Sequence, residues 1–244
     1  MFNERQARSN AVDFFKKLTF RKDTEFGIRI NSRCSEYCER DVHTIFSEVW
    51  PDVLLFPKVN SYQDLEWVYL KLTKIESMLK TVGGEYKTLS LVVMIESAIS
   101  IVNLKSILDF CLNNLKILRA ESLLFGSDDF LSSIGVSRSK DTDNLLLARQ
   151  SIVLYAKAYG LGAIDMVDTD YNDLISFKRT SITSSKLGFT GLIFTECVGR
   201  QVIHPCQIPI ANVAYSPSEE MVKWAKTVLE LYERSQLENQ VRNI

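Results

Sequence analysis

Two apolar runs in this chain are each followed by an acidic side chain. Residues 89–95 lead directly to Glu96, and residues 122–125 lead through a short Gly-Ser-Asp segment to Asp129. The carboxyl ends of buried parallel strands are where α/β barrels place their chemistry. Because carboxylate oxygens are preferred ligands of Mg²⁺, two such acids on neighbouring strands predict a site for one hard metal ion.

The residues alone leave other roles open for these two acids. Each could instead cap the helix that follows its strand, and from the sequence the two interpretations carry about equal weight. Asp128 is an alternative contributor in place of Asp129. The sequence therefore leaves two hypotheses for each acid, a metal ligand and a helix cap.

Two basic side chains also stand at strand ends. Arg29 lies between two isoleucines and is expected to point into the barrel mouth, where a guanidinium can hold a carboxylate through two hydrogen bonds. Its alternative role is an internal ion pair with one of the barrel acids. Lys58, in a Phe-Pro-Lys-Val segment, could form a Schiff base with a carbonyl substrate if it is desolvated. A lysine that closes a strand and neutralises nearby acids is commoner.

Asp165 and His204 are further candidates at strand ends. Asp165 follows an apolar strand and is the candidate catalytic residue, whereas Asp170 and Asp173 fit an acidic helix start equally well. His204 could act as a general base, but a strand-end histidine held by its neighbours is the commoner state.

Composition narrows the classes of partner. The chain has 244 residues with 29 Lys and Arg against 30 Asp and Glu, so its charges nearly cancel and we expect no nucleic-acid partner. It has no run of about 18 uncharged apolar residues, so we expect no membrane span. The charged residues 1–8 resemble neither a secretory signal nor a transit peptide, and we expect no targeting peptide there. A small-molecule substrate is the better starting hypothesis.

The five cysteines predict reduced thiols, because their number is odd and their spacing does not repeat. Cys34, Cys38 and His43 could supply three zinc ligands, but the only other histidine is His204. Incidental thiols on a polar helix are therefore the favoured interpretation.

Strand patterns alternate with helical patterns along the whole chain, which predicts βαβ units and a parallel sheet. Strands are expected at residues 26–31, 52–59, 89–96 and 163–167. Two more are expected to end at residues 125 and 203, and residues 192–198 are an optional further strand. Helices are expected at residues 4–18, 36–48, 64–80, 100–113, 142–159, 171–186 and 218–237. No linker divides these units, so we predict a single domain over residues 1–238 and a tail at 239–244.

Nine ordered segments carry a resemblance to a known family. They are residues 29–32, 56–59, 95–98, 125–130, 148–150, 163–165, 188–191, 203–208 and 215–218. Together they resemble the citrate lyase beta subunit family of the HpcH/HpaI aldolase/citrate lyase superfamily, and within it the mitochondrial citrate lyase beta-like branch. The resemblance implies a (β/α)8 TIM barrel, a homotrimer when the barrel is complete, and residence in mitochondria.

The resemblance also implies a chemistry. The family cleaves a carbon–carbon bond in a 3-hydroxyacyl-CoA of the citramalyl-CoA, citryl-CoA or malyl-CoA type, giving acetyl-CoA and a keto acid with the help of Mg²⁺. Glu96 and Asp129 fall on its metal ligands. Arg29 falls on its substrate-facing arginine, and Lys58 is taken as a second substrate-binding residue.

The chain departs from the family pattern at both ends and in one insertion. It starts inside a helix that follows the second strand in the family, so we expect the first two barrel strands to be missing. It also lacks the family's last segment, and residues 192–200 replace a single lysine, whose charge Arg200 could restore. We therefore expect weak or no activity from this chain alone. The alternative is a non-catalytic barrel fragment that keeps the metal-binding residues and associates with full-length subunits.

Overall fold

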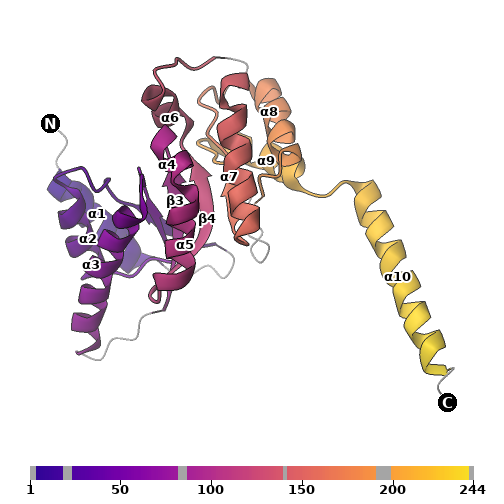
Figure 1. Cartoon of the computed structure of the whole chain (residues 1–244), viewed down its shortest axis with the longest axis horizontal. Coiled ribbons are helices and arrows are strands. Elements are labelled where there is room, and N and C mark those ends of the chain that lie inside the picture. Colours follow the sequence, from indigo (N-terminus) through magenta and orange to yellow (C-terminus); the bar gives the residue numbers. More distant parts are fainter. Residues whose placement is uncertain (1–3, 19–23, 82–86, 140–141, 191–198, 242–244) are drawn as a thin grey trace.

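Five parallel strands form a sheet at the centre of the described part of the molecule (Figure 1). The structure is a computed structural model that describes residues 4–18, 24–81, 87–139, 142–190 and 199–241. The strands are β1 (Gly27–Arg29), β2 (Val53–Phe56), β3 (Leu89–Ile95), β4 (Leu118–Phe125) and β5 (Gly162–Ile164).

The strands lie in the sheet in the same order as in the chain, β1-β2-β3-β4-β5. A doubly wound sheet reverses its strand order part-way, whereas the wall of a (β/α) barrel winds in one direction throughout. The predicted fold class, α/β with parallel strands wound as in a barrel, is thereby confirmed. Within the described residues β1 has a free edge, and the sheet does not close. The outer edge of β5 makes only isolated bridges, from Ala163 to Thr190 and, directly after the strand, from Asp165 to Arg200.

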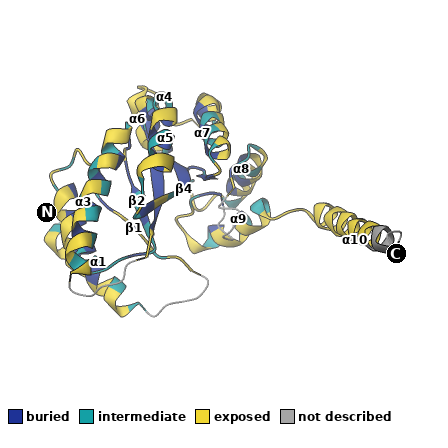
Figure 2. Ribbon diagram, turned by 60° about the horizontal axis from the view of Figure 1, so that its bottom comes forward, coloured by how far each residue is buried: buried dark blue, intermediate teal, exposed yellow. Residues whose placement is uncertain are grey.

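Helices connect the strands and lie in an arc around them (Figure 2). In α3, for example, Leu65, Val68, Leu72 and Ile75 recur three or four residues apart and are all buried, as expected of a helix with one apolar face. The helices are α1 (Glu4–Lys17), α2 (Cys38–Phe46), α3 (Tyr62–Lys80), α4 (Ala98–Val102), α5 (Leu104–Asn114), α6 (Ser127–Ser133), α7 (Leu146–Ala158), α8 (Leu174–Lys186), α9 (Ile208–Tyr215) and α10 (Glu219–Val241).

α10 extends away from the other elements (Figure 1). Its side chains are exposed as far as residue 236, including large apolar ones. Those apolar side chains are Met221, Val222, Trp224, Val228, Leu229, Leu231 and Tyr232. In the part of the chain that the structure describes, no helix is both long and apolar enough to cross a membrane.

The two faces of the sheet are covered to different extents. On the helix side, Leu54 and Phe56 of β2 are fully buried and belong to the main core. Their neighbours Val53 and Leu55 alternate with them and are only half buried. These two side chains pack on a smaller cluster, which contains Val92, Met94 and Leu124. The second face corresponds to a barrel interior and is the less covered one.

The pairing of β3 with β4 contains one irregularity that matters for the site. The register shifts by one residue after Leu91, so that Glu121 is an extra residue on β4, as in a β-bulge. Beyond this point Ile95 pairs with Phe125. The two strands therefore end level with each other, and the residues that follow them lie side by side.

The helix predicted at residues 100–113 is two helices in the structure. They meet at Asn103, which leaves the helical conformation, with φ −92° and ψ 3°. Its side-chain amide donates a hydrogen bond to the carbonyl oxygen of Asn60 at 2.8 Å. An asparagine side chain that binds backbone in this way competes with continuous helix, which the apolar periodicity did not reveal.

The strand predicted to end at residue 203 is absent from the described residues. Arg200 makes only a single parallel bridge to Asp165, and a 3₁₀ turn, Pro205–Gln207, follows soon after. Pro205 has no N–H and cannot extend a ladder of hydrogen bonds. The optional strand at 192–198, and most of the insertion at 192–200, lie outside the described residues.

Candidate functional site

Glu96 is the first residue after β3 and is 7% exposed. The helix-capping alternative does not describe it, because α4 is capped by Ser97, whose hydroxyl accepts a hydrogen bond from the Ser100 N–H at 3.1 Å. The Glu96 carboxylate instead accepts a hydrogen bond from the backbone N–H of Lys58, with Oε2 at 2.6 Å from the nitrogen. It is thus held at the carboxyl edge of the sheet rather than at a helix end.

Gly126 leaves the space that the Glu96 carboxylate occupies. It follows β4, and its N–H donates to the Ile95 carbonyl oxygen at 3.0 Å, which continues the register set by the bulge. A Cβ atom built on Gly126 would lie 2.6 Å from Oε1 of Glu96 and 3.0 Å from its Cδ. Any larger residue would therefore push the carboxylate out of its place.

Asp129 lies in the first turn of α6, close to the end of β4. Its carboxylate is half exposed and forms an ion pair with the Lys58 ammonium, with Oδ1 and Nζ 3.0 Å apart. Asp128 points to a different partner, since its Oδ1 lies 3.0 Å from Nε of Arg138. Of the two adjacent aspartates, Asp129 is the one placed beside Glu96 and Lys58.

Lys58 contacts both acids at once, through two different parts of the residue. Its N–H binds Glu96 and its ammonium binds Asp129. It is also the only non-glycine among the described residues with a positive φ, at +54°. That conformation is uncommon for a side chain other than Asn, Asp or His, and such outliers often mark functional sites.

Arg29 is the last residue of β1 and is exposed. It makes no ion pair with any of the described residues, so the alternative of an internal ion pair is not realised there. Its positive charge nevertheless acts to lower the pKa of Glu96. The guanidinium therefore stands near Glu96 and is not paired with an acid among the described residues.

The electrostatics of Glu96 reflect these neighbours. Burial raises the pKa of Glu96 above its usual value, and the negative charge of Asp129 raises it further. The Lys58 N–H and the positive charges of Lys58 and Arg29 oppose this rise. A buried carboxylate beside a second negative charge forms a place where a cation is favourable.

A small pocket of about 230 Å³ opens beside these groups. It is lined by polar side chains that follow β2, β3 and β4, namely Lys58, Asn60, Glu96, Ser97, Asp129, Ser132 and Ser133. The side-chain atoms that could ligate a metal ion here are carboxylate, amide and hydroxyl oxygens. Mg²⁺ is commonly held by one or two carboxylates plus water and substrate. The residues present therefore fit this ion, with Glu96 and Asp129 as its protein ligands.

Asp165 lies elsewhere, in a buried network behind β5. It is fully buried and paired with Arg149 of α7, whose Nε lies 3.1 Å from Oδ1. Its second oxygen accepts a hydrogen bond from the hydroxyl of Ser184 on α8 at 2.5 Å, and Oδ1 also accepts the Met166 N–H at 2.9 Å. The carboxylate joins two helices to the strand and does not reach the pocket beside Glu96.

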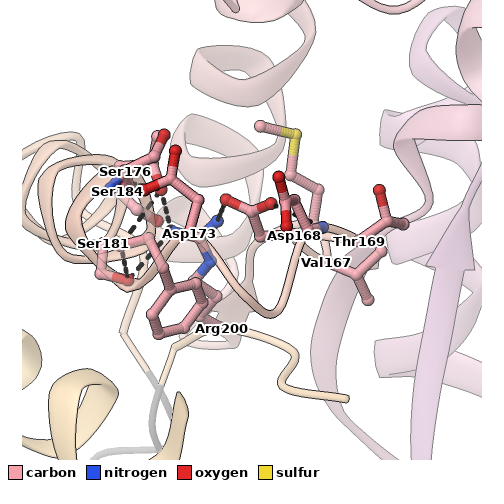
Figure 3. Close-up of polar contacts among 12 residues, drawn as sticks. Val167, Asp168, Thr169, Asp173, Ser176, Ser181, Ser184 and Arg200 are labelled. Carbon is pink, nitrogen blue, oxygen red and sulfur yellow. Dashed lines mark hydrogen bonds and ion pairs between the residues drawn. The ribbon is translucent and has the colours of Figure 1, made fainter. Parts of the chain in front are cut away.

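Arg200 supplies a second buried cation close to this network (Figure 3). It pairs with Asp168 at 3.6 Å and donates to the hydroxyl of Ser181 at 3.0 Å. A larger pocket of about 660 Å³ adjoins it, lined mainly by the segments before α7 and α8. Neither Glu96 nor Asp129 lines that pocket, so its size alone does not make it the site of the chemistry.

His204 is exposed and stacks on Tyr171, with ring centroids 4.9 Å apart. Its Nδ1 lies 2.9 Å from Sγ of Cys206. It is thus held by its neighbours.

Among the described residues no group of three or more His, Cys, Asp or Glu side chains could hold a metal ion.

Sequence reasoning missed two contributors to the site. The first is Gly126, although a glycine between an apolar strand and an acidic helix start is a signal for close backbone approach. The second is the backbone of Lys58, which holds Glu96 while its side chain holds Asp129. No sequence pattern marks a positive φ at a lysine.

Residues 3–197 match the family described as HpcH/HpaI aldolase/citrate lyase. The chain belongs to this family. The match covers most of the chain, and it confirms the predicted relationship. The strand-end acids and the sheet that winds in one direction are therefore features of a member of the HpcH/HpaI aldolase/citrate lyase family.

Individual relatives place the chain more closely. It is 35% identical over 225 residues to the mitochondrial citramalyl-CoA lyase of Homo sapiens, and 27% identical over 212 residues to the citrate lyase subunit beta of Escherichia coli. These alignments each cover 87% of this chain, but 60% and 64% of the relatives. The chain therefore spans less than two thirds of the length of these curated relatives.

A solved structure gives the same fold. The CitE protein of Mycobacterium tuberculosis, in complex with magnesium, acetoacetate and coenzyme A, superposes with a TM-score of 0.62 at 22% identity, covering 85% of this chain and 67% of that one. At this identity the similarity establishes the fold. It supports the barrel-type winding that the strand order indicates.

Proposed function

We propose that this chain carries the metal and substrate site of a Mg²⁺-dependent carbon–carbon lyase that acts on a 3-hydroxyacyl-CoA. The observation that carries the proposal is the pair Glu96 and Asp129, brought side by side at the carboxyl edge of β3 and β4 next to a pocket. The relationship to citramalyl-CoA lyase and citrate lyase subunit beta supports the substrate class. The products are acetyl-CoA and a keto acid such as pyruvate.

Each residue has a physical role in this proposal. Glu96 and Asp129 hold the ion, and Gly126 keeps the space in which the Glu96 carboxylate sits. Bound Mg²⁺ supplies a Lewis acid that polarises the oxygens of the keto acid as it forms. Arg29 makes no ion pair with the described residues and offers its two-pronged guanidinium to the carboxylate of the substrate.

Asp165 has a positioning role in the same proposal rather than a catalytic one. Among the described residues, the hydrogen bonds of its carboxylate are to Arg149, Ser184 and the Met166 N–H, within a fully buried network. A carboxylate held in this way has no oxygen left for a substrate proton. It fixes α7 and α8 against β5.

A second candidate function has its own supporting observation. In the described residues the sheet does not close and β1 has a free edge, and Lys58 and Asp129 are each about half exposed. Water has access to such a site, and an exposed site stabilises charge less well than a closed one. A protein that binds Mg²⁺ without turnover, and acts with complete subunits, fits this feature.

One assay separates the two functions. The purified chain is given citramalyl-CoA and Mg²⁺, and pyruvate is followed through a coupled dehydrogenase. Turnover that disappears in both Glu96→Gln and Asp129→Asn supports the lyase. Asp128→Asn serves as the matched control, because Asp128 pairs with Arg138 and should keep turnover.

Absence of turnover in the wild type, combined with Mg²⁺ binding by calorimetry that both site variants lose, would favour the second function. Turnover that survives in both site variants would contradict the assignment of the metal ligands. Complementing the chain with a full-length relative then tests whether activity needs a complete subunit.

We propose further that the protein resides in mitochondria and self-associates, with a trimer as the expected state. The mitochondrial relatives support the location. The apolar side chains of α10 that no described residue covers support self-association. Light scattering should give about three times the 27.9 kDa of one chain, and organelle fractionation should place the protein with matrix markers.

A further inference from the structure

Lys58 forms two separable contacts at the proposed metal site. Its backbone N–H, 2.6 Å from Oε2 of Glu96, holds the buried carboxylate. Its ammonium, 3.0 Å from Oδ1 of Asp129, holds the exposed one. Only the second contact depends on the side chain, so the two can be changed independently by substitution.

The ammonium contact has the properties of one that can be broken. The side chains of Lys58 and Asp129 are 51% and 49% exposed. Ion pairs with this much access to water contribute little to stability, because solvent replaces either partner at low cost. A lysine head group on a flexible four-carbon chain can also leave without disturbing the backbone.

The position of the ammonium is the one that a metal ion would need. An ion held by Glu96 and Asp129 together must contact the Asp129 carboxylate, which Lys58 now neutralises. Like charges at such short separation repel, so the ammonium and the ion cannot share that carboxylate without cost.

We propose that Lys58 is a displaceable counter-ion: its ammonium neutralises Asp129 when no metal is bound, and Mg²⁺ must displace it to bind. This inference rests on the metal site of the proposed function and adds a device that sets its affinity. The backbone N–H of Lys58 keeps Glu96 in place throughout, since the positive φ that aims it belongs to the main chain.

The proposal predicts that removing the ammonium tightens Mg²⁺ binding. In Lys58→Met the competing charge is lost while the backbone donor stays, and the dissociation constant for MgCl₂ should fall by about tenfold at low ionic strength. Lys58→Gly should do the same and adopts the φ of +54° without strain. Lys58→Arg keeps the charge and should change the constant by less than about twofold.

The experiment is isothermal titration calorimetry of the full chain with MgCl₂. Lys87→Met is the matched control, because Lys87 pairs with Asp52 at an exposed position and its loss changes net charge equally without touching the site. Its dissociation constant should match that of the wild type. Thermal unfolding with and without MgCl₂ gives a second readout of the same affinities.

The outcomes separate this inference from the proposed function. Tighter binding in Lys58→Met and Lys58→Gly, but not in Lys87→Met, supports the counter-ion role. Equal or weaker binding in both Lys58 variants, with a wild type that binds, overturns that role and leaves the metal site standing. No binding by the wild type or by either Lys58 variant overturns the metal site and the counter-ion role together.

Discussion

The structure uses strand-end acids in two contrasting ways. At the ends of β3 and β4, Glu96 and Asp129 face a pocket, and the cation beside them is a half-exposed lysine. At the end of β5, Asp165 is fully buried and committed to Arg149 and Ser184. The position of an acid in a barrel therefore does not decide its role. What decides it is whether its partners leave an oxygen free.

The largest effect should come from breaking the buried pair. Arg149→Met removes the ion-pair partner of the buried Asp165 carboxylate, and such changes cost about 3–5 kcal/mol. Urea unfolding at pH 7 measures the loss. If the free energy of unfolding falls by less than about 1 kcal/mol, as expected for an exposed ion pair, the Arg149–Asp165 pair is no more important for stability than Lys58–Asp129.

An intermediate effect should come from filling the space beside Glu96. Gly126→Ala places a methyl group 2.6 Å from the carboxylate oxygen, which should cost about 1–3 kcal/mol in stability and weaken Mg²⁺ binding by about tenfold or more. Gly160→Ala is the control, because Gly160 has φ +69° and no atom near its Cβ position. It should lose about 1 kcal/mol and keep its affinity for Mg²⁺.

The exposed acids should matter little for stability. Asp129→Asn removes a half-exposed ion pair and should change the free energy of unfolding by less than about 1 kcal/mol while abolishing Mg²⁺ binding. Asp128→Asn should be equally stable and should still bind Mg²⁺. If calorimetry shows the reverse dependence on the two aspartates, Asp128 is the ligand and the geometry at the end of β4 has been misassigned.

The cysteines give a comparison that involves no loss of stability. Burial raises the pKa of Cys38 and of Cys111 to about 12, so at pH 8 almost none of either thiol is ionised. Since the thiolate is the reactive form, iodoacetamide at pH 8 should label exposed Cys34 and leave these two intact. Mass spectrometry of the native and urea-unfolded chain, in a Cys197→Ser background, reads the pattern. Labelling of Cys111 at the rate of Cys34 would show that α5 is not packed as described.

Much of this arrangement could be predicted from the sequence, for physical reasons. The alternation of apolar runs and amphipathic segments predicts the parallel sheet, because periodicity follows directly from which faces are buried. Glu96 and Asp129 were predicted side by side, because the carboxyl ends of consecutive parallel strands meet at one edge. Both predictions depend on local patterns and on the direction of the chain.

What could not be predicted depends on contacts between distant residues. Asp165 follows its strand just as Glu96 does, and only the packing of α7 and α8 commits it to Arg149 and Ser184. The break at Asn103 depends on the carbonyl oxygen of Asn60, 43 residues away. The strand expected near residue 203 is reduced to one bridge between Arg200 and Asp165, because apolar composition does not by itself fix a ladder of hydrogen bonds.

The extra residue at Glu121 also has a consequence for how this protein can change over evolution. It lies upstream of the site and sets which residue of β4 faces the end of β3. Inserting one residue there would move Phe125 into the place of Gly126 and put a benzyl group against Glu96. Insertions beyond α6, by contrast, would leave that alignment untouched. Near residue 121, therefore, selection should act on the length of the chain more strongly than on the identity of its side chains.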